Sequence, residues 1–317
     1  MKILIATPAP RGSNTGNRIT AERWARIFRD LGHTVTVSSD ESLRSGRYDL
    51  LVALHALKSA EIILEFRKQF PSNPIVVALT GTDLHRDLGR DPATRQSLNF
   101  ADRIVLIEPR GKNLLDKSLQ KKCSIILQSA TPPVRRAARR AKSFSVSIIG
   151  HLRKEKDPFL IVKALNLLPS HSRIQVVHIG QPYNGEMKSR AQKAGKACRR
   201  YRWLGRQSHS ETKRLLSNSD LTVLTSKIEG APNVISEAIV CSTPVLTTEI
   251  TATVGMLGED YPGFFPVGDA ERLAQLLLRC EREKGFLRQL NRYLQKLKPK
   301  FSPAKERRSW KELLNRI

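Results

Sequence analysis

The sequence predicts an α/β protein made of two doubly wound domains, and three observations lead to that fold class. Short runs of β-branched and aliphatic residues alternate with amphipathic stretches, which is typical of parallel sheets whose strands are joined by helices. The runs are apolar at successive positions, so helices must cover both faces of each sheet. The chain of 317 residues is long enough for two domains of ordinary size, each with its own core.

The first domain is expected over residues 1–134. Between its first two strands lies a predicted helix with Trp24, Ile27, Phe28 and Leu31 at the i, i+3, i+4, i+7 spacing of one apolar face. The predicted strands of this domain are Ile3–Ala6, Thr34–Ser38, Leu50–Leu54, Ile75–Leu79, Ile104–Ile107 and Ser124–Leu127.

A change of composition separates the second domain, which is expected over residues 143–299. Thr131–Pro133 and the basic run Arg135–Lys142 have no apolar period, as is typical of a linker. Residues 300–317 are predicted to form a helix that packs back on the first domain. Its apolar stripe consists of Trp310, Leu313, Leu314 and Ile317. The predicted strands of the second domain are Ser145–Ile149, Ile174–Ile179, Leu221–Thr225 and Val245–Thr247. We expect the carboxyl ends of the two sheets to face each other across a cleft.

Composition argues against several classes of protein. The four cysteines form no C-x-x-C pair and have no histidine cluster near them, which favours neither disulfides nor a zinc site. The apolar run Ile3–Ala6 is too short for a signal peptide, and no run approaches the length of a membrane-spanning helix. A cytoplasmic protein without a membrane span is therefore expected, and its oligomeric state is left open.

The net charge of +26 is the one extreme value. A basic balance favours phosphate-rich partners, anionic membranes or nucleic acid. The basic residues are spread along the chain, however, and only Arg135–Lys142 is dense. Because no helix-turn-helix, RNP or finger pattern accompanies that run, a solvated basic surface is expected rather than nucleic-acid binding.

The segment Ser219–Ala238 carries the strongest functional pattern. A tight loop containing Glu229 is expected to lead into a helix that begins near Asn233. Unpaired N–H groups at a helix start bind anions with the help of the helix dipole. A diphosphate bound there would leave Glu237 within reach of a ribose and Glu229 near a sugar, since a carboxylate accepts hydrogen bonds from two hydroxyls. The alternative is an ordinary capped helix with acidic residues near its start.

This segment resembles the Glu-x7-Glu motif of the GT-B glycosyltransferases related to glycogen and sucrose synthases. The resemblance implies the GT-B fold, with Glu229 by the donor sugar, Glu237 on the ribose, and the amides around Asn233 on the phosphates. The donor-binding residues that it implies here are Glu229, Gly230, Ala231, Asn233, Val234 and Glu237. It extends to Thr243–Val245 and to Phe265–Asp269, which looks like the terminal-strand loop of that family.

The second domain opens with Gly150–Pro158, which is similar to the Gly-Arg-Leu-x3-Lys-Gly loop of the same family. The resemblance places Lys156 on the donor diphosphate, where it would neutralise charge on the departing nucleotide. His151 stands where the family has Arg and Asp157 where it has Gly, and Arg153 would supply the missing guanidinium. A structural loop with exposed basic residues is the alternative.

A weaker resemblance connects Tyr201–Gly205 with the loop whose backbone reads the base of the donor. With this loop and the one that opens the domain, the implied donor-binding residues are Gly150, His151, Arg153, Lys156, Trp203 and Leu204.

Three loops of the first domain follow carboxyl ends of strands and are expected to face the cleft. The first, Thr7–Thr20, contains two glycines and runs into a helix, a geometry that accepts anions, although a plain turn is the alternative. The other two follow the third and fourth strands. Lys58 beside His55 favours an exposed anionic site, whereas a satisfied core histidine is the alternative for His55. The candidate acceptor-binding residues are Gly12, Thr15, Gly16, Asn17, Arg18, His55, Lys58, Thr80, Gly81, Thr82 and Asp83.

Several segments together resemble the selenosugar synthases of selenoneine biosynthesis, along essentially the whole chain. The resemblance implies that a UDP-sugar, notably UDP-N-acetylglucosamine, is joined to selenophosphate with formation of a carbon–selenium bond. The histidine of the Gly-His-Leu-Arg loop belongs to this pattern, whereas Ala231 and Ser242 depart from it at positions where glycine is usual. The segments that carry the resemblance are Pro8–Pro10, Thr15–Arg18, Leu54–Ala56, Thr80–Leu84, Gly150–Arg153, Tyr201–Gly205 and Gly258–Gly263.

Selenophosphate is a small, charged and soft nucleophile that needs a positive pocket and no strong general base. Arg18, His55, Lys58 and Arg86 would supply that pocket. The candidate catalytic residues are His55, Arg153, Lys156 and Glu229. Because the loops contain no Asp-x-Asp metal cluster, transfer without a metal or another cofactor is expected.

Two rival hypotheses stay open. One is a glycosyltransferase that acts on a sugar or lipid hydroxyl, which would need no selenophosphate. The other is a nucleic-acid-binding α/β protein with a vestigial donor site, which would bind RNA or DNA in a strongly salt-dependent way and release no UDP. The intact pair Glu229 and Glu237 weighs against the second rival.

Overall fold

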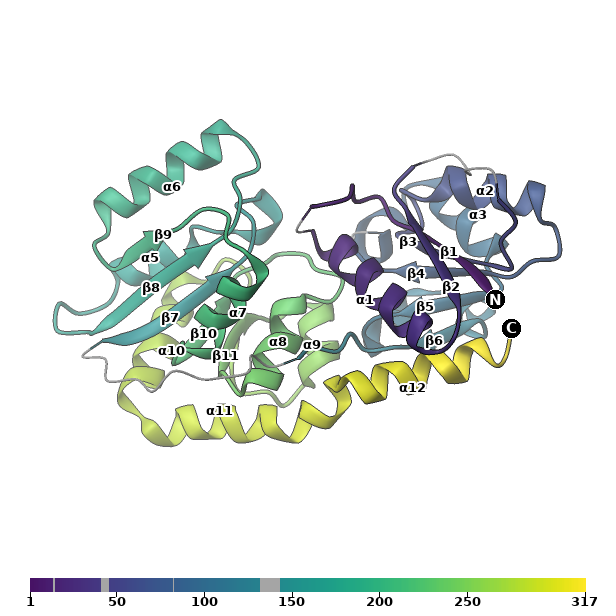
Figure 1. Cartoon of the computed structure of the whole chain (residues 1–317). Coiled ribbons are helices and arrows are strands. Elements are labelled where there is room, and N and C mark those ends of the chain that lie inside the picture. The colour runs from purple at the N-terminus through teal and green to yellow at the C-terminus, as the bar shows by residue number, and fades with distance from the viewer. Residues whose placement is uncertain (14, 41–45, 82, 132–142) are drawn as a thin grey trace. The chain divides into compact units, whose positions relative to one another are not determined.

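The computed structural model describes residues 1–13, 15–40, 46–81, 83–131 and 143–317. The described chain forms two six-stranded sheets, each made of parallel strands, and divides into two compact units (Figure 1). The predicted α/β fold class with two doubly wound sheets is confirmed. The first unit comprises Met1–Gln128, Glu229–Pro232 and Pro303–Ile317, and the second comprises Ser129–Ile228 and Asn233–Ser302.

The strands of the first unit are β1 (Lys2–Ala6), β2 (Thr34–Ser38), β3 (Leu50–Leu54), β4 (Ile75–Leu79), β5 (Arg103–Leu106) and β6 (Cys123–Ile125). Its helices are α1 (Gly16–Asp30), α2 (Ala60–Gln69), α3 (Pro92–Phe100), α4 (Lys117–Gln120) and α12 (Pro303–Leu314). The strand order is β2-β1-β3-β4-β5-β6. The central strands β3 and β4 are apolar at every position and wholly buried, because helices cover them (Figure 1).

The C-terminal helix α12 packs on α1 within the first unit. The indole of Trp310 makes edge contacts with the rings of Trp24 and Phe28, with centroids 4.7 and 4.8 Å apart. The buried carboxylate of Glu306 accepts hydrogen bonds from Trp24 Nε1 at 2.8 Å and from Arg23 Nε at 3.2 Å. Aromatic packing and a buried ion pair thus fasten the last helix to the first.

The strands of the second unit are β7 (Phe144–Ile149), β8 (Ile174–Ile179), β9 (Tyr201–Trp203), β10 (Leu221–Leu224), β11 (Val245–Thr248) and β12 (Phe264–Phe265). Its helices are α5 (Leu160–Asn166), α6 (Gly185–Ala197), α7 (His209–Ser217), α8 (Asn233–Cys241), α9 (Thr251–Leu257), α10 (Ala270–Arg282) and α11 (Lys284–Leu297). The strand order is β12-β11-β10-β7-β8-β9. The edge strands β9 and β12 are absent from the prediction, because two or three residues are too few to establish a period.

Each sheet has one place where the strand order reverses. In the first sheet it lies between β1 and β3, and in the second between β7 and β10. Loops at the carboxyl ends of the strands beside such a reversal form the usual ligand site of doubly wound sheets. The topology therefore selects the loops after β7 and β10 in the second unit, and those after β1 and β3 in the first.

Two expectations concern regions outside these elements. The basic part of the predicted linker, Arg135–Lys142, lies outside the described residues, as does Thr82. No helix in the described part of the chain is both long enough and apolar enough to cross a membrane.

Candidate functional site

Two loops at the strand reversal of the second sheet are bonded to each other. The loop Gly150–Asp157 follows β7, and the loop that begins at Thr225 follows β10. The Thr225 hydroxyl lies 2.8 Å from the carbonyl oxygen of Lys156 and 2.9 Å from that of Asp157. The backbone N–H of Lys227 donates to the Glu155 carbonyl at 2.7 Å, and its ammonium pairs with the Asp157 carboxylate at 3.5 Å. The half-buried Lys156 is thus held on a braced loop.

Two positions where the sequence departs from an expected glycine have left-handed backbone. Asp157 has a φ of 41° and Ser242 a φ of 56°. This region is strained for residues with a Cβ and favours glycine. The turns that glycine would form are therefore made here by an aspartate, whose carboxylate pairs with Lys227, and by a serine.

A buried histidine on β8 fixes the start of the loop Gly150–Asp157 by a hydrogen bond. His178 on β8 is 1% exposed, and its Nε2 lies 3.0 Å from the carbonyl oxygen of Gly150. Its Nδ1 lies 2.8 Å from the hydroxyl of Tyr201 on β9. Burial lowers the pKa of His178 to about 4, so the ring is neutral. Because a carbonyl only accepts, Nε2 carries the proton and Nδ1 accepts from Tyr201.

The loop after β8 also packs closely against Gly150, through Gly180. A Cβ at Gly180 would overlap the Gly150 carbonyl, so only glycine fits there. The indole N–H of Trp203 donates to the Gly180 carbonyl at 2.9 Å, which shows that this side chain serves the loop structure. Leu204 beside it is 38% exposed, as a residue at a binding surface would be. The loops after β7, β8 and β9 therefore form one braced edge.

The remaining donor-loop side chains differ in exposure. His151 Nδ1 accepts from the backbone N–H of Gln181 at 3.2 Å, which ties it to the loop after β8. Arg153 is exposed, and its guanidinium lies 5.6 Å from the centroid of the Tyr183 ring, which is 72% exposed. An arginine and an aromatic ring thus stand at the surface beside the braced edge.

The Glu-x7-Glu segment is divided between the two units. Glu229, Gly230 and Ala231 group with the first unit, whereas α8 with Asn233, Val234 and Glu237 belongs to the second. Glu237 is 8% exposed, and its Oε1 lies 3.9 Å from Nε2 of His209, the first residue of α7. The Oδ1 atom of Asn233, at the start of α8, is buried and has no hydrogen-bond partner among the described residues.

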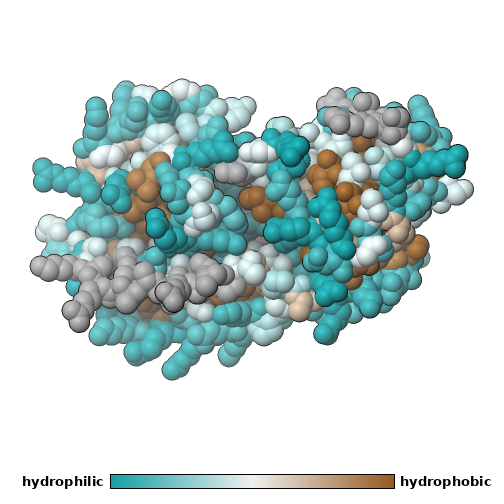
Figure 2. All heavy atoms as spheres, viewed as in Figure 1, coloured by the Kyte–Doolittle hydropathy of each residue, from teal (hydrophilic) through white to brown (hydrophobic). Residues whose placement is uncertain are grey.

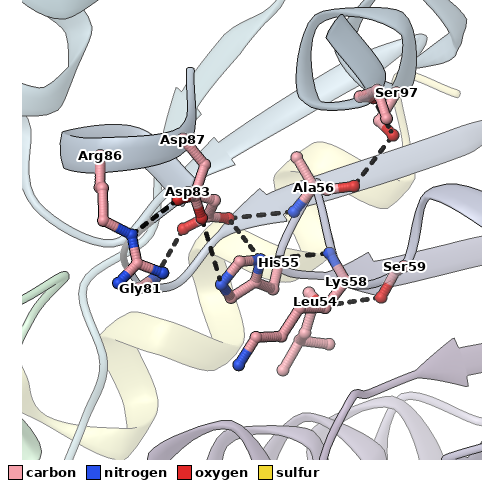
Figure 3. Close-up of polar contacts among 11 residues, drawn as sticks. Leu54, His55, Ala56, Lys58, Ser59, Gly81, Asp83, Arg86, Asp87 and Ser97 are labelled. Atoms are coloured by element: carbon pink, nitrogen blue, oxygen red, sulfur yellow. Dashed lines mark hydrogen bonds and ion pairs between the residues drawn. The ribbon is translucent and has the colours of Figure 1, made fainter. Parts of the chain in front are cut away.

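In the first unit, His55 directly follows β3 and lies among polar side chains of the next loop (Figure 3). It is 3% exposed, and its φ is 75°. Its Nδ1 and Nε2 lie 3.9 Å from Asp83 Oδ2 and 4.0 Å from Asp87 Oδ2. Nδ1 accepts from the backbone N–H of Lys58 at 3.4 Å. Burial lowers the pKa of His55, against the opposite effect of the two carboxylates. The burial of His55 corrects the expectation of an exposed anionic site at this residue; Lys58 itself is exposed.

Asp83 joins the loops after β3 and β4. Its fully buried carboxylate accepts from the backbone N–H of Ala56 at 3.0 Å and of Gly81 at 2.8 Å (Figure 3). Arg86 in the following π-helical turn, Asp83–Asp87, pairs with Asp87 at 2.8 Å. Asp83 therefore fixes the loops that carry His55 and Gly81. The sequence predicted acceptor binding for Asp83 and did not predict this structural role.

The loop after β1 contains a left-handed glycine, Gly12, with a φ of 81°. Thr15 precedes α1, and Gly16 and Asn17 are its first two residues. Arg18 is 8% exposed and pairs with Glu22 at 2.6 Å. Its charge is therefore already compensated, which weakens the expectation that Arg18 belongs to a positive acceptor pocket.

Sequence reasoning missed a set of buried polar atoms at the carboxyl edge of the first sheet. They have no hydrogen-bond partner among the described residues, which is unusual for buried groups. These atoms are Thr7 Oγ1 after β1, Thr80 Oγ1 after β4, Glu108 Oε1 after β5 and Gln128 Oε1 after β6. Burial raises the pKa of Glu108 to about 7. An acidic residue two positions after a buried strand is the signal that could have identified Glu108.

Within the described residues, no group of three or more His, Cys, Asp or Glu side chains is arranged to hold a metal ion. Independence from metals and cofactors stays a prediction. The site residues as a whole also remain predictions. Apart from Thr82, which lies outside the described residues, the structure places them in loops, strand ends and the first turns of helices at the carboxyl edges of the two sheets.

The chain was compared with known proteins. A family model described as "Glycosyl transferases group 1" matches residues 134–297. Among curated proteins, none matches the chain. Among solved structures, Anabaena HepE in complex with UDP-glucose has a TM-score of 0.81 at 15% identity, with 100% of both chains covered.

Two further solved structures are similar to this one. Sucrose-phosphate synthase from Thermosynechococcus elongatus has a TM-score of 0.79 at 14% identity, with 99% of this chain and 98% of that chain covered. The UDP-forming α,α-trehalose-phosphate synthase from Burkholderia vietnamiensis has a TM-score of 0.71 at 13% identity, with 96% and 78% covered. At such identities the likeness establishes the fold.

Proposed function

Because the chain belongs to the group 1 glycosyl transferases and has the GT-B fold, we propose that its donor is a UDP-sugar and its acceptor selenophosphate. The donor proposal depends on one observation: hydrogen bonds join the loops after β7 and β10 at the strand reversal of the second sheet. They hold Lys156 beside the loop that leads to α8. Two of the similar structures support it, since one holds UDP-glucose and another is described as UDP-forming.

The donor residues would act on the departing nucleotide. Lys156 and Arg153 would neutralise the diphosphate, and the amides at the start of α8 would add hydrogen bonds from a helix N-terminus. Glu237 would accept hydrogen bonds from the ribose hydroxyls, and Glu229 from the sugar. Loss of the bond between C1 of the sugar and the diphosphate oxygen leaves the electron pair on UDP.

The acceptor proposal is supported by the resemblance of the first-domain loops and by the exposed cation Lys58. Selenium of selenophosphate would attack C1 and form the carbon–selenium bond as UDP leaves. Hydrolysis of the phosphorus–selenium bond would then give phosphate and a selenol. A soft anion of this kind needs orientation and charge compensation more than a general base.

A second candidate acceptor is a sugar or lipid hydroxyl, and the surroundings of His55 favour it. The carboxylates of Asp83 and Asp87, 3.9 and 4.0 Å from the ring nitrogens, would stabilise the positive charge that His55 gains if it takes a proton from a hydroxyl. Its left-handed backbone is strained, and strain of this kind is concentrated at functional sites.

Incubation of the purified protein with UDP-N-acetylglucosamine and either selenophosphate or a panel of sugar hydroxyls separates the two acceptors. Mass spectrometry is expected to detect a selenosugar, and Lys58→Ala is expected to raise KM for selenophosphate without changing KM for the UDP-sugar. UDP release with hydroxyl acceptors alone, abolished by His55→Ala, would replace the selenophosphate proposal with the second candidate.

A further inference from the structure

The C-terminal part of the second unit carries an unusual row of cations. Residues 284–305 contain no aspartate or glutamate. Along α11 and the short 3₁₀ turn that follows, a basic residue recurs at every fourth position, and all of these side chains are exposed. We name this set the basic row; it consists of Lys284, Arg288, Arg292, Lys296 and Lys300.

Packing within the unit does not explain the basic row. The buried side of α11 consists of Phe286, Leu290 and Leu294, and it packs against α8 and α10. The cations lie on the other side, which faces solvent along the lower edge of the second unit (Figures 1 and 2). None of the five forms an ion pair with a carboxylate elsewhere in the described chain.

The arrangement of the row opposes helix stability. Side chains four residues apart are neighbours on a helix, and like charges at that spacing repel each other. Within α11 the basic row contains three successive repulsive pairs, which a polyanion on that side would turn into favourable contacts. The row rises about 6 Å per step, so its four cations on α11 extend over about 18 Å of the helix, and Lys300 follows in the 3₁₀ turn.

The geometry points to an anionic membrane surface as the partner: we propose that α11 adsorbs to negatively charged lipid headgroups through the basic row. The phosphates of an anionic membrane surface attract long cationic side chains electrostatically, and this attraction needs no shaped binding pocket. The exposed side of α11 offers no fully exposed aromatic ring for base stacking, which disfavours single-stranded nucleic acid as the partner. It also offers no apolar side chains for insertion, so binding is electrostatic and reversible by salt.

The test is sedimentation of the full-length protein with phosphatidylcholine vesicles, with and without phosphatidylserine. The wild type is expected to bind only the anionic vesicles, and high salt should release it. Replacement of the basic row by glutamine is expected to weaken binding ~100-fold or more. Thermal unfolding of this variant should occur at a temperature no lower than that of the wild type, since the repulsive pairs are gone.

A matched control removes the same charge from another side of the second unit. It replaces five exposed cations of α6 and the segment after it by glutamine, namely Lys188, Lys193, Lys196, Arg199 and Arg202. This variant should bind anionic vesicles as the wild type does. Equal losses in the two variants would overturn the proposal, as would tighter binding of the wild type to duplex RNA than to vesicles at the same salt. The inference does not depend on the donor or acceptor, and either can fail without affecting it.

Discussion

The carbonyl oxygen of Gly150, at the start of the braced loop, lies 3.0 Å from Nε2 of the buried, neutral His178. The hydroxyl of Tyr201 donates to the other ring nitrogen, so the proton stays on Nε2, where it faces the carbonyl. The two strands that follow β7, namely β8 with His178 and β9 with Tyr201, thus fix the backbone from which Lys156 and Arg153 project.

Removing this contact should weaken both the stability of the fold and the binding of the donor. His178→Leu leaves the Gly150 carbonyl and the Tyr201 hydroxyl without partners, which costs about 1–3 kcal/mol of unfolding free energy. We expect KM for the UDP-sugar to rise about tenfold while KM for the acceptor is unchanged, and we expect His178→Gln, which keeps an N–H donor, to restore most of the affinity. Equal effects of Leu and Gln would show that the hydrogen bond does not matter.

The left-handed backbone of Ser242 predicts a stabilising substitution. Ser242→Gly should raise the free energy of unfolding by about 0.5–1 kcal/mol, because glycine adopts a φ of 56° without steric strain. Ser242→Ala, the matched control, keeps the Cβ and should not stabilise the protein. Urea unfolding of the three proteins measures the difference, and a stabilisation by alanine equal to that by glycine would contradict the explanation.

Glu306 should be a major anchor of α12. Glu306→Ala removes the acceptor of Trp24 Nε1 and leaves the largely buried Arg23 without its carboxylate, and breaking such a pair costs about 3–5 kcal/mol. The exposed Glu312 on the same helix serves as the control, since Glu312→Ala should change stability by less than about 0.5 kcal/mol. A small effect at both positions would mean that aromatic packing alone holds the helix.

Glu108 should make stability depend on pH. Folding raises its pKa from 4.5 to about 7, so the folded protein holds a proton that the unfolded chain releases in this range. The stabilisation is complete below pH 4.5 and is lost as the pH rises through 7, and it amounts to about 1–3 kcal/mol.

The variant Glu108→Gln isolates this effect, since glutamine has no proton to lose. The lowered pKa of His178 acts in the opposite direction over the same range, so the informative quantity is wild type minus variant. Relative to Glu108→Gln, the wild type should lose stability between pH 4.5 and 7.5. A difference that stays constant with pH would refute the assignment.

The fold could be predicted because most of its strands have a recognisable local sequence pattern. Leu50–Leu54 and Ile75–Leu79 are continuous apolar runs, and both are strands with those limits. The edge strand Tyr201–Trp203 has an exposed arginine at its middle position and only three residues, so no local pattern distinguishes it from a loop.

The site was less accessible to sequence reasoning, since its properties depend on contacts between distant residues. The sequence places His55 at the end of a strand, but its burial depends on Asp83 and Asp87, which belong to the next loop. The pairing of Arg18 with Glu22, by contrast, is local: the two residues are four apart on a helix, and this spacing could have indicated the ion pair. Residue types, strand ends and pairs within one helix can be read from the sequence, whereas burial and contacts between distant loops cannot.

The central claim is that the start of α8 and the loop before it bind a UDP-sugar, and titration of UDP into the protein by calorimetry tests it most directly. Wild type should bind UDP, and Glu237→Ala should weaken binding about 10–100-fold through the lost ribose contacts. Glu271→Ala, which removes a glutamate from the first turn of α10, should leave affinity unchanged. No UDP binding by the wild type, or equal affinity of all three proteins, would contradict the account.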